Sequence, residues 1–176
     1  PPDLLPFGFH GPYRPSKFMV AQVNLEGAAT ITCADGDDNT ANAFTEGEHI
    51  IMQSTDGTKR VYVLTDGSET GASATGTVLT EGSDTGASTL SAATAAKGTC
   101  VAVSNNLNTH NQATILNEFR AAVVHANGHN GKITVSTALT PANGEQTLTF
   151  TQASEGTGGL TGIFNNISQF TINAGG

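Results

Sequence analysis

The acidic residues of two nearly identical loops are the first side chains in this sequence that could do chemistry. The stretch VLTDGSETGAS at residues 63–73 returns as VLTEGSDTGAS at residues 78–88, with Asp and Glu exchanged. Hard oxygen ligands of this kind suit Ca²⁺. The Gly, Ser and Thr residues around them favour charged turns in water, which is the interpretation we prefer. We therefore expect paired turns at the same end of adjacent strands, with no metal bound by their carboxylates, Asp66, Glu69, Glu81 and Asp84.

A second acidic stretch has the ligand spacing of a calcium loop. Asp35, Asp37 and Asn39 stand at alternate positions, and Glu46 follows at the twelfth position. Thr40 occupies the place where such a loop turns on Gly, and no helices are expected on either side. The sequence therefore favours a solvated turn over a metal site.

Two histidines have a spacing that could bind zinc from one face of a helix. His125 and His129 are four residues apart, but Gly128 lies between them and is expected to end the helix. We therefore expect both to be polar residues at a helix end, where a cation is mildly favourable.

The two cysteines stand in apolar contexts flanked by Thr. Cys33 and Cys100 are expected to be buried thiols, with a disulfide between them as the alternative. No Ser or Cys has the local signature of an activated nucleophile, and Glu145 and Glu155 are separated by a strand. The sequence thus predicts no catalytic residues, no cofactor and no metal, and so a protein that is not an enzyme.

Charge and composition restrict the partners. Seven Lys and Arg stand against fifteen Asp and Glu, which gives a formal net charge of −8. An acidic chain repels phosphate, so nucleic acid is not an expected partner. No apolar run reaches the length of about 18 residues that a membrane helix needs, and no small-molecule substrate is expected.

Short strands and one helix are expected to position these residues. Asp56-Gly57 between two apolar runs predicts a hairpin over residues 48–65, and residues 88–96 are either a loop or a short helix. The alternating pattern predicts further strands at the following ranges. They are residues 29–33, 76–80, 98–104, 132–136, 146–152 and 166–172.

A helix is predicted at residues 110–126. Thr109 and Gln112 fit a capping box, and Asn127-Gly128 supplies a left-handed stop. Its apolar stripe comprises Ile115, Leu116, Phe119, Val123 and Ala126, and we expect it to pack on a sheet against Val61, Val63, Val101 and Val103. The fold class is therefore α+β, with an antiparallel β-sheet domain and one packed helix within residues 23–176.

Residues 1–22 are predicted to form an extended arm that precedes this domain. Five of the six prolines lie there, and proline excludes both helix and central strand. The arm is also rich in aromatic residues, which a free linker would lack. We expect it to dock on another subunit through Phe7, Phe9, Tyr13, Arg14 and Phe18.

Three stretches resemble a module of virion structural proteins from tailed bacteriophages, especially marine ones. They are EGEHIIMQSTDGTKRVYVLTDG, NGHNGKITVS and LTFTQASEGTGGLTGI, and the resemblance covers roughly residues 28–165. The chain departs from the module where Gly-Asn often follows the Gly-rich turn, because Gly158-Gly159-Leu160 stands there instead. The motifs are structural, so the resemblance implies a virion component and no chemistry.

The sequence leads us to expect a non-enzymatic phage virion structural protein. Small size, an acidic body and an aromatic arm favour a capsid decoration or cement protein, present in many copies on the virion and assembled in the host cytoplasm. Its partners would be other copies of itself and the major capsid protein or other virion proteins. The alternative is a tail-fibre or appendage/filament subunit whose loops face the host, and a secreted bacterial surface protein is a third class.

Overall fold

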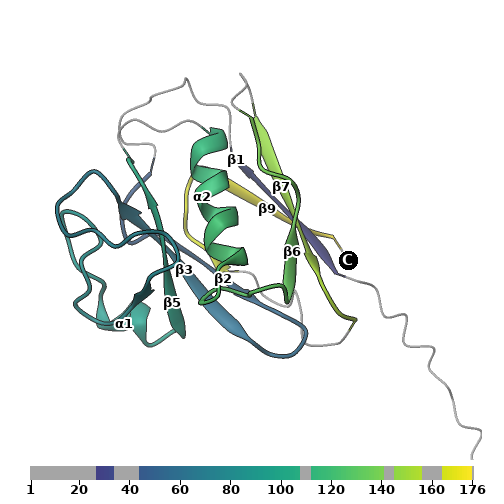
Figure 1. Ribbon diagram of the computed structural model, residues 1–176, viewed down its shortest axis with the longest axis horizontal. Helices are drawn as coiled ribbons and strands as arrows, with labels where there is room; N and C mark the ends of the chain where they lie inside the picture. Colours follow the sequence, from purple (N-terminus) through teal and green to yellow (C-terminus); the bar gives the residue numbers. More distant parts are fainter. Residues whose placement is uncertain (1–26, 34–43, 108–111, 141–144, 156–163, 176) are drawn as a thin grey trace, which may run out of the picture.

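Two β-sheets and one long helix make up the described part of the chain. The computed structural model describes residues 27–33, 44–107, 112–140, 145–155 and 164–175. The helix α2 (Gln112–Val124) lies against both sheets (Figure 1). The α+β class predicted from the sequence is confirmed, with two sheets in place of the single sheet expected.

The first sheet, here called sheet A, is antiparallel throughout and has the strand order β6-β7-β1-β9. Its strands are β1 (Ala28–Cys33), β6 (Ile133–Val135), β7 (Gln146–Gln152) and β9 (Phe170–Gly175). β7 matches its predicted range, whereas β9 begins four residues later than the range predicted at 166–172. The delay arises because the Asn165 side chain bonds both the amide and the carbonyl of Ile167 and so holds the chain in a turn.

The second sheet, sheet B, has the strand order β4-β5-β3-β2-β8. Its strands are β2 (His49–Gln53), β3 (Lys59–Asp66), β4 (Val78–Leu79), β5 (Thr99–Asn105) and β8 (Phe164–Asn165). The central strands β3 and β5 are parallel, which the expectation of purely antiparallel strands missed. The segment between them is long enough to return to the starting end of the sheet, as a parallel pair requires.

The hairpin predicted at residues 48–65 is confirmed. β2 and β3 pair from His49 opposite Val63 to Gln53 opposite Lys59. In the turn, Asp56 Oδ1 accepts hydrogen bonds from the Ser54 hydroxyl at 2.6 Å and from a backbone amide two residues later at 3.0 Å. The Asp-Gly dipeptide thus forms the turn for which it was singled out.

The turn of this hairpin also ties the two sheets together. Gln152, at the end of β7, accepts from the Thr55 amide at 3.0 Å and donates to the Gln53 carbonyl at 3.0 Å. Lys132, just before β6, forms an ion pair with Asp56 at 2.7 Å. These bonds fix the end of sheet A against the β2–β3 turn.

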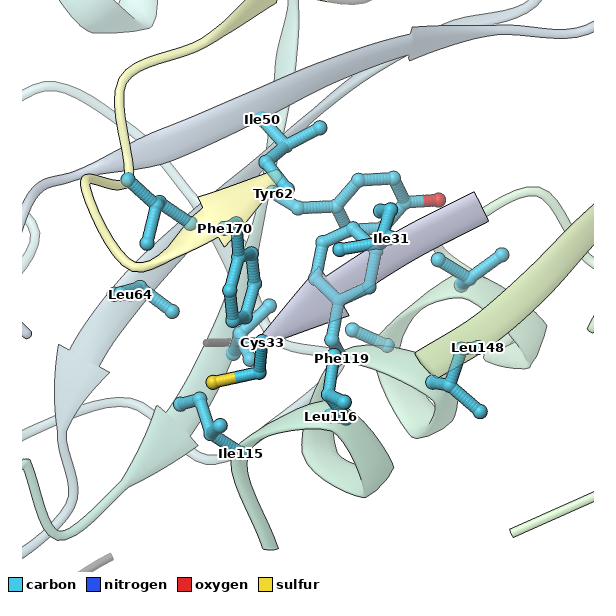
Figure 2. Close-up of a cluster of buried hydrophobic side chains, with 14 of the residues drawn as sticks. Ile31, Cys33, Ile50, Tyr62, Leu64, Ile115, Leu116, Phe119, Leu148 and Phe170 are labelled. Atoms are coloured by element: carbon cyan, nitrogen blue, oxygen red, sulfur yellow. The ribbon is translucent and has the colours of Figure 1, made fainter. Parts of the chain in front are cut away.

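The main core lies where α2 meets the inner faces of both sheets. Figure 2 shows Phe119 pointing from the helix into a cluster that contains Tyr62 of sheet B and Phe170 of sheet A. The Phe119 ring makes edge contacts with Tyr62 at 5.2 Å and Phe150 at 5.5 Å between centroids. The predicted helix face is therefore buried as expected, apart from Ala126, which lies beyond the end of the helix and is exposed.

The sheet partners expected for the helix are only half right. Val101 and Val103 share the main core with α2, but Val61 and Val63 point to the opposite face of sheet B. There they form a second core with Leu79, Leu90, Cys100 and Ala102. The short helix α1 (Ala92–Ala95) packs beside this second core, so residues 88–96 contain a short helix. Because side chains alternate along a strand, consecutive residues of β3 serve the two cores in turn.

The end of α2 differs from the predicted left-handed stop. The residues with left-handed backbone are Asn130 and Gly131, with φ of 45° and 84°, and Gly128 is not among them. The chain folds back so closely that the His129 amide donates to the Val123 carbonyl at 2.8 Å. Gly128 is thus needed for close backbone approach and not for a positive φ.

We expect Gly128→Ala to lower the free energy of unfolding by about 2–3 kcal/mol, as overpacking does in a tight site. An added Cβ would overlap the Ala122 carbonyl oxygen and lie 2.7 Å from that of Val123. These are backbone atoms, so they cannot move aside as a flexible side chain would. Urea denaturation measures the loss.

Gly131→Ala is the matched control for this variant. A Cβ at Gly131 meets nothing within 4 Å, so only its positive φ is penalised. That penalty is about 1–2 kcal/mol. A smaller loss for Gly128→Ala than for Gly131→Ala would show that the close approach at Gly128 relaxes freely.

Candidate functional site

Two of the sequence-based sites fall outside the described residues. The arm with its proposed contacts, Phe7, Phe9, Tyr13, Arg14 and Phe18, is one of them. Most of the calcium-like stretch, residues 35–43, is the other. The structure therefore places neither, and both remain expectations.

The doubled loops do not leave adjacent strands at one end of a sheet, so that expectation was wrong. The first copy continues from β3 and the second from β4, and β5 lies between these strands. β3 runs parallel to β5 and β4 runs antiparallel to it. The chain therefore leaves β3 and β4 at opposite ends of sheet B.

The second loop nevertheless folds back onto the first. The Asp66 amide donates to the Thr85 carbonyl at 2.7 Å. Asp84 Oδ2 lies where a Cβ on Gly71 would be only 2.6 Å away. Asp66 and Asp84 each accept from the backbone amide two residues later, at 3.0 Å and 2.8 Å. These two carboxylates are thus used to form turns, and the loops make one joint acidic surface.

In the part of the chain that the structure describes, no three His, Cys, Asp or Glu side chains are placed to share a metal ion. We therefore expect EDTA to leave the melting temperature unchanged, because a metal that bound only the folded state would stabilise it. A rise of several degrees on adding Ca²⁺ would contradict this. The Asp84→Asn variant, which keeps an acceptor oxygen for the turn, should behave as the parent does toward both reagents.

His129 is buried, which corrects its expected place among polar residues at a helix end. Its Nε2 lies 3.2 Å from the Thr58 carbonyl oxygen, which can only accept, so Nε2 carries the proton. Nδ1 then accepts from the Tyr62 hydroxyl at 2.6 Å. Burial lowers the pKa of His129 to about 4, and the charges of Arg60 and Lys132 add to that effect. The histidine is a neutral link between β3, the β2–β3 turn and the end of α2.

His49 makes a second neutral contact at the edge of sheet B. Its Nδ1 donates to the Gly47 carbonyl at 3.1 Å, and Nε2 accepts from Lys97 Nζ at 2.8 Å. The ring stacks on Phe164, with centroids 5.3 Å apart. Burial, and to a lesser degree the Lys97 charge, lowers the pKa of His49, while the Gly47 carbonyl opposes this. The cluster attaches β8 to β2.

Both cysteines are buried free thiols, as preferred from the sequence. Cys33 belongs to the main core and Cys100 to the second core, on the other side of sheet B. Burial raises the pKa of Cys33 to about 12 and also raises that of Cys100. A thiol kept protonated is a poor nucleophile, so packing accounts for both residues.

The outer face of sheet A is a continuous uncharged surface of hydroxyl groups. In β1 and β7 the outward residues alternate with the buried ones, and cross-strand pairing aligns them in rows such as Thr171–Thr32–Thr147. The Thr32 and Thr147 hydroxyls are hydrogen-bonded at 2.8 Å. The outward residues in full are Ala28, Thr30, Thr32, Thr134, Thr147, Thr149, Thr151, Thr171 and Asn173.

Sequence reasoning missed this surface, although its signal was present. Each strand shows Thr at every second position, as in TLTFT of β7. Only the register across four strands shows that these threonines share one face, which we call the threonine face. It carries no charge in a chain whose formal net charge is −8.

No family model, curated protein or solved structure matches this chain. Neither helix of the described residues has the length and hydropathy needed to cross a membrane. The functional argument therefore depends on the surfaces just described and on the resemblance seen in the sequence.

Proposed function

We propose that this chain is a non-enzymatic structural protein of a phage virion, and that it decorates the capsid in many copies. The observation that carries the proposal is the threonine face of sheet A. It is the uncharged side of an acidic molecule, and it is presented by four paired strands. The virion assignment itself depends on the resemblance of the sequence to phage modules.

Electrostatics explains why such a face suits assembly. Copies with a net charge of −8 repel one another and repel other acidic surfaces. Docking through a charged face would also require charges to lose their water, which costs several kcal/mol per unpaired ion. The threonine face avoids both costs, and its hydroxyls can donate or accept hydrogen bonds with a partner.

A charge placed in this face tests the proposal. Thr149 is exposed near the middle of β7. We expect Thr149→Lys to weaken binding to tailless, DNA-filled heads at least tenfold, a loss of about 1.4 kcal/mol, because the ammonium must be desolvated. Co-sedimentation with the heads measures the affinity, and an unchanged melting temperature shows that the variant is folded.

Two further variants make this experiment specific. Thr149→Val keeps the face uncharged and should retain most of the binding. Thr80→Lys adds the same charge to an exposed residue beyond β4, on sheet B, and should bind as the parent does. Equal binding by all three variants would refute the threonine face as the docking surface.

A second candidate function is a subunit of a fibre or filament appendage. It is favoured by strand β9, whose outer edge is unpaired among the described residues and could join copies into a longer array. Filaments formed by the purified chain alone, without capsid, would favour this candidate over decoration.

A further inference from the structure

The four edges of the two sheets are not equally protected against added strands. In sheet B, the edge strands β4 and β8 have two residues each, and in sheet A the edge strand β6 has three. The fourth edge, β9, has six residues, Phe170–Gly175. Proteins usually guard a long edge with charges, proline or a bulge. The sequence FTINAG of β9 contains neither a charge nor a proline.

The outer side of β9 is thus a template for another strand. Its inner side pairs with β1 along the whole length, from Phe170 opposite Cys33 to Gly175 opposite Ala28. Among the described residues, none pairs with its outer side. Backbone amides and carbonyls on that side are therefore open to a partner, and a strand added there would extend the threonine face.

We propose that the outer edge of β9 binds, as an added strand, residues 16–25 of a neighbouring copy. The inference depends on the proposed function, in which the N-terminal arm joins subunits, and it names the surface that receives the arm. Strand addition supplies backbone hydrogen bonds for affinity and alternate side chains for specificity.

The sequence of this segment fits an added strand. Residues 16–25 read SKFMVAQVNL and contain no proline, whereas residues 1–15 contain five. Proline cannot donate to a ladder, so only the later segment of the arm can pair along its length. Alternate positions are apolar, which suits the side facing a core, and they are Met19, Ala21, Val23 and Leu25.

The position of β1 brings the segment to the correct end of the sheet. β1 begins at Ala28, directly opposite Gly175 at the end of β9. If residues 16–21 pair with the six residues of β9, residues 22–27 remain as a connector of about 20 Å when extended. Two copies that meet at this end of sheet A can therefore exchange segments, each covering the edge of the other.

Cysteine cross-linking of full-length chains tests the contact. One chain carries Asn173→Cys, on an exposed residue of β9, and a second, distinguishable by mass, carries Val20→Cys or Ala21→Cys. Paired strands hold opposite Cβ atoms about 4.5–5.5 Å apart, close to disulfide range, and consecutive arm positions cover both faces. We expect one of the two mixtures to form a disulfide-linked heterodimer under mild oxidation.

The control for this experiment replaces Asn173→Cys with Thr149→Cys. Thr149 is exposed on the same face of sheet A but lies on β7, two strands from β9. The native thiols are buried and do not interfere. Cross-linking to both sites at equal rates, or to neither, would overturn the inference. A disulfide that forms only within a chain carrying both cysteines would also overturn it, because the segment would then cover its own edge.

Proline substitution gives an independent measurement. The double variant Val20→Pro/Ala21→Pro removes two consecutive amides, of which one must face the added ladder. Sedimentation should show self-association weakened at least tenfold, while Leu5→Pro, in the proline-rich part, should leave it unchanged. Equal association by both variants would overturn the inference.

The head-binding experiment separates this inference from the proposed function. If the chain binds heads but no contact with β9 is found, only the β9 inference fails. If the chain binds no heads although copies cross-link through β9, the decoration function fails and the β9 contact stands.

Discussion

Replacing Phe119 with alanine should lower the free energy of unfolding by about 3–5 kcal/mol, as the loss of a large buried side chain does. Phe119 is completely buried at the junction of α2 with both sheets. Its ring contacts Tyr62 on sheet B and Phe150 on sheet A. The cavity would therefore open between three elements, which cannot collapse onto it together without disturbing the pairing of strands.

Urea denaturation followed by circular dichroism measures this loss. Val124→Ala is the matched control, because Val124 lies on the same helix and is 42% exposed. That variant should cost less than about 1 kcal/mol, as surface changes usually do. A similar small cost for Phe119→Ala would show that the helix does not form the centre of the core.

Lowering the pH from about 6.5 to about 4 should remove about 3 kcal/mol of stability through His129 alone, at 1.36 kcal/mol per pKa unit. The unfolded chain takes up a proton on this histidine near pH 6.5, whereas burial lowers its pKa in the folded state to about 4. The unfolded state thus binds more protons throughout this window. Stability is fully present above pH 6.5 and falls as the pH falls.

The physical cause is the buried link between His129 and its two neighbours. A second proton would have to enter at Nδ1, where the ring accepts from the Tyr62 hydroxyl. The nearby charges of Arg60 and Lys132 oppose protonation, while that of Asp56 favours it. Burial also lowers the pKa of His49, so this second histidine adds to the acid-induced loss in the same direction.

Chemical denaturation at a series of pH values measures the effect. His129→Gln should be less stable at pH 7 but should lose less stability between pH 6.5 and pH 4 than the parent does. His125→Gln, at an exposed histidine of the same chain segment, should keep the full loss. If His129→Gln and the parent have the same pH dependence, the buried histidine is not the cause.

Local features could be predicted from the sequence because their causes are local. The hairpin follows from Asp56-Gly57, where the side chain of one residue bonds the turn and the next has a φ of 85°. α2 and β7 follow from apolar residues spaced for one buried face, since an α-helix and a strand have different periods. The two buried thiols agree with their apolar surroundings in the sequence.

Contacts between distant parts of the chain could not be predicted in this way. Nothing near Val61 and Val63 in sequence shows that they face a second core, because both faces of β3 are covered. The burial of His129 depends on Tyr62 and Thr58, which lie about seventy positions earlier. The threonine face and the free edge of β9 likewise exist only through the order of strands in sheet A.

The doubled loop separates the two kinds of information most clearly. The sequence by itself determined that both copies turn, because each contains the same Gly, Asp or Glu, and Ser positions. The tertiary structure alone decided what each copy buries. Val63 is 0% exposed and its counterpart Val78 is 44% exposed, because β3 has neighbours on both sides and β4 is an edge. Burial is a property of the neighbours that folding supplies, and one local sequence can receive two different sets of them.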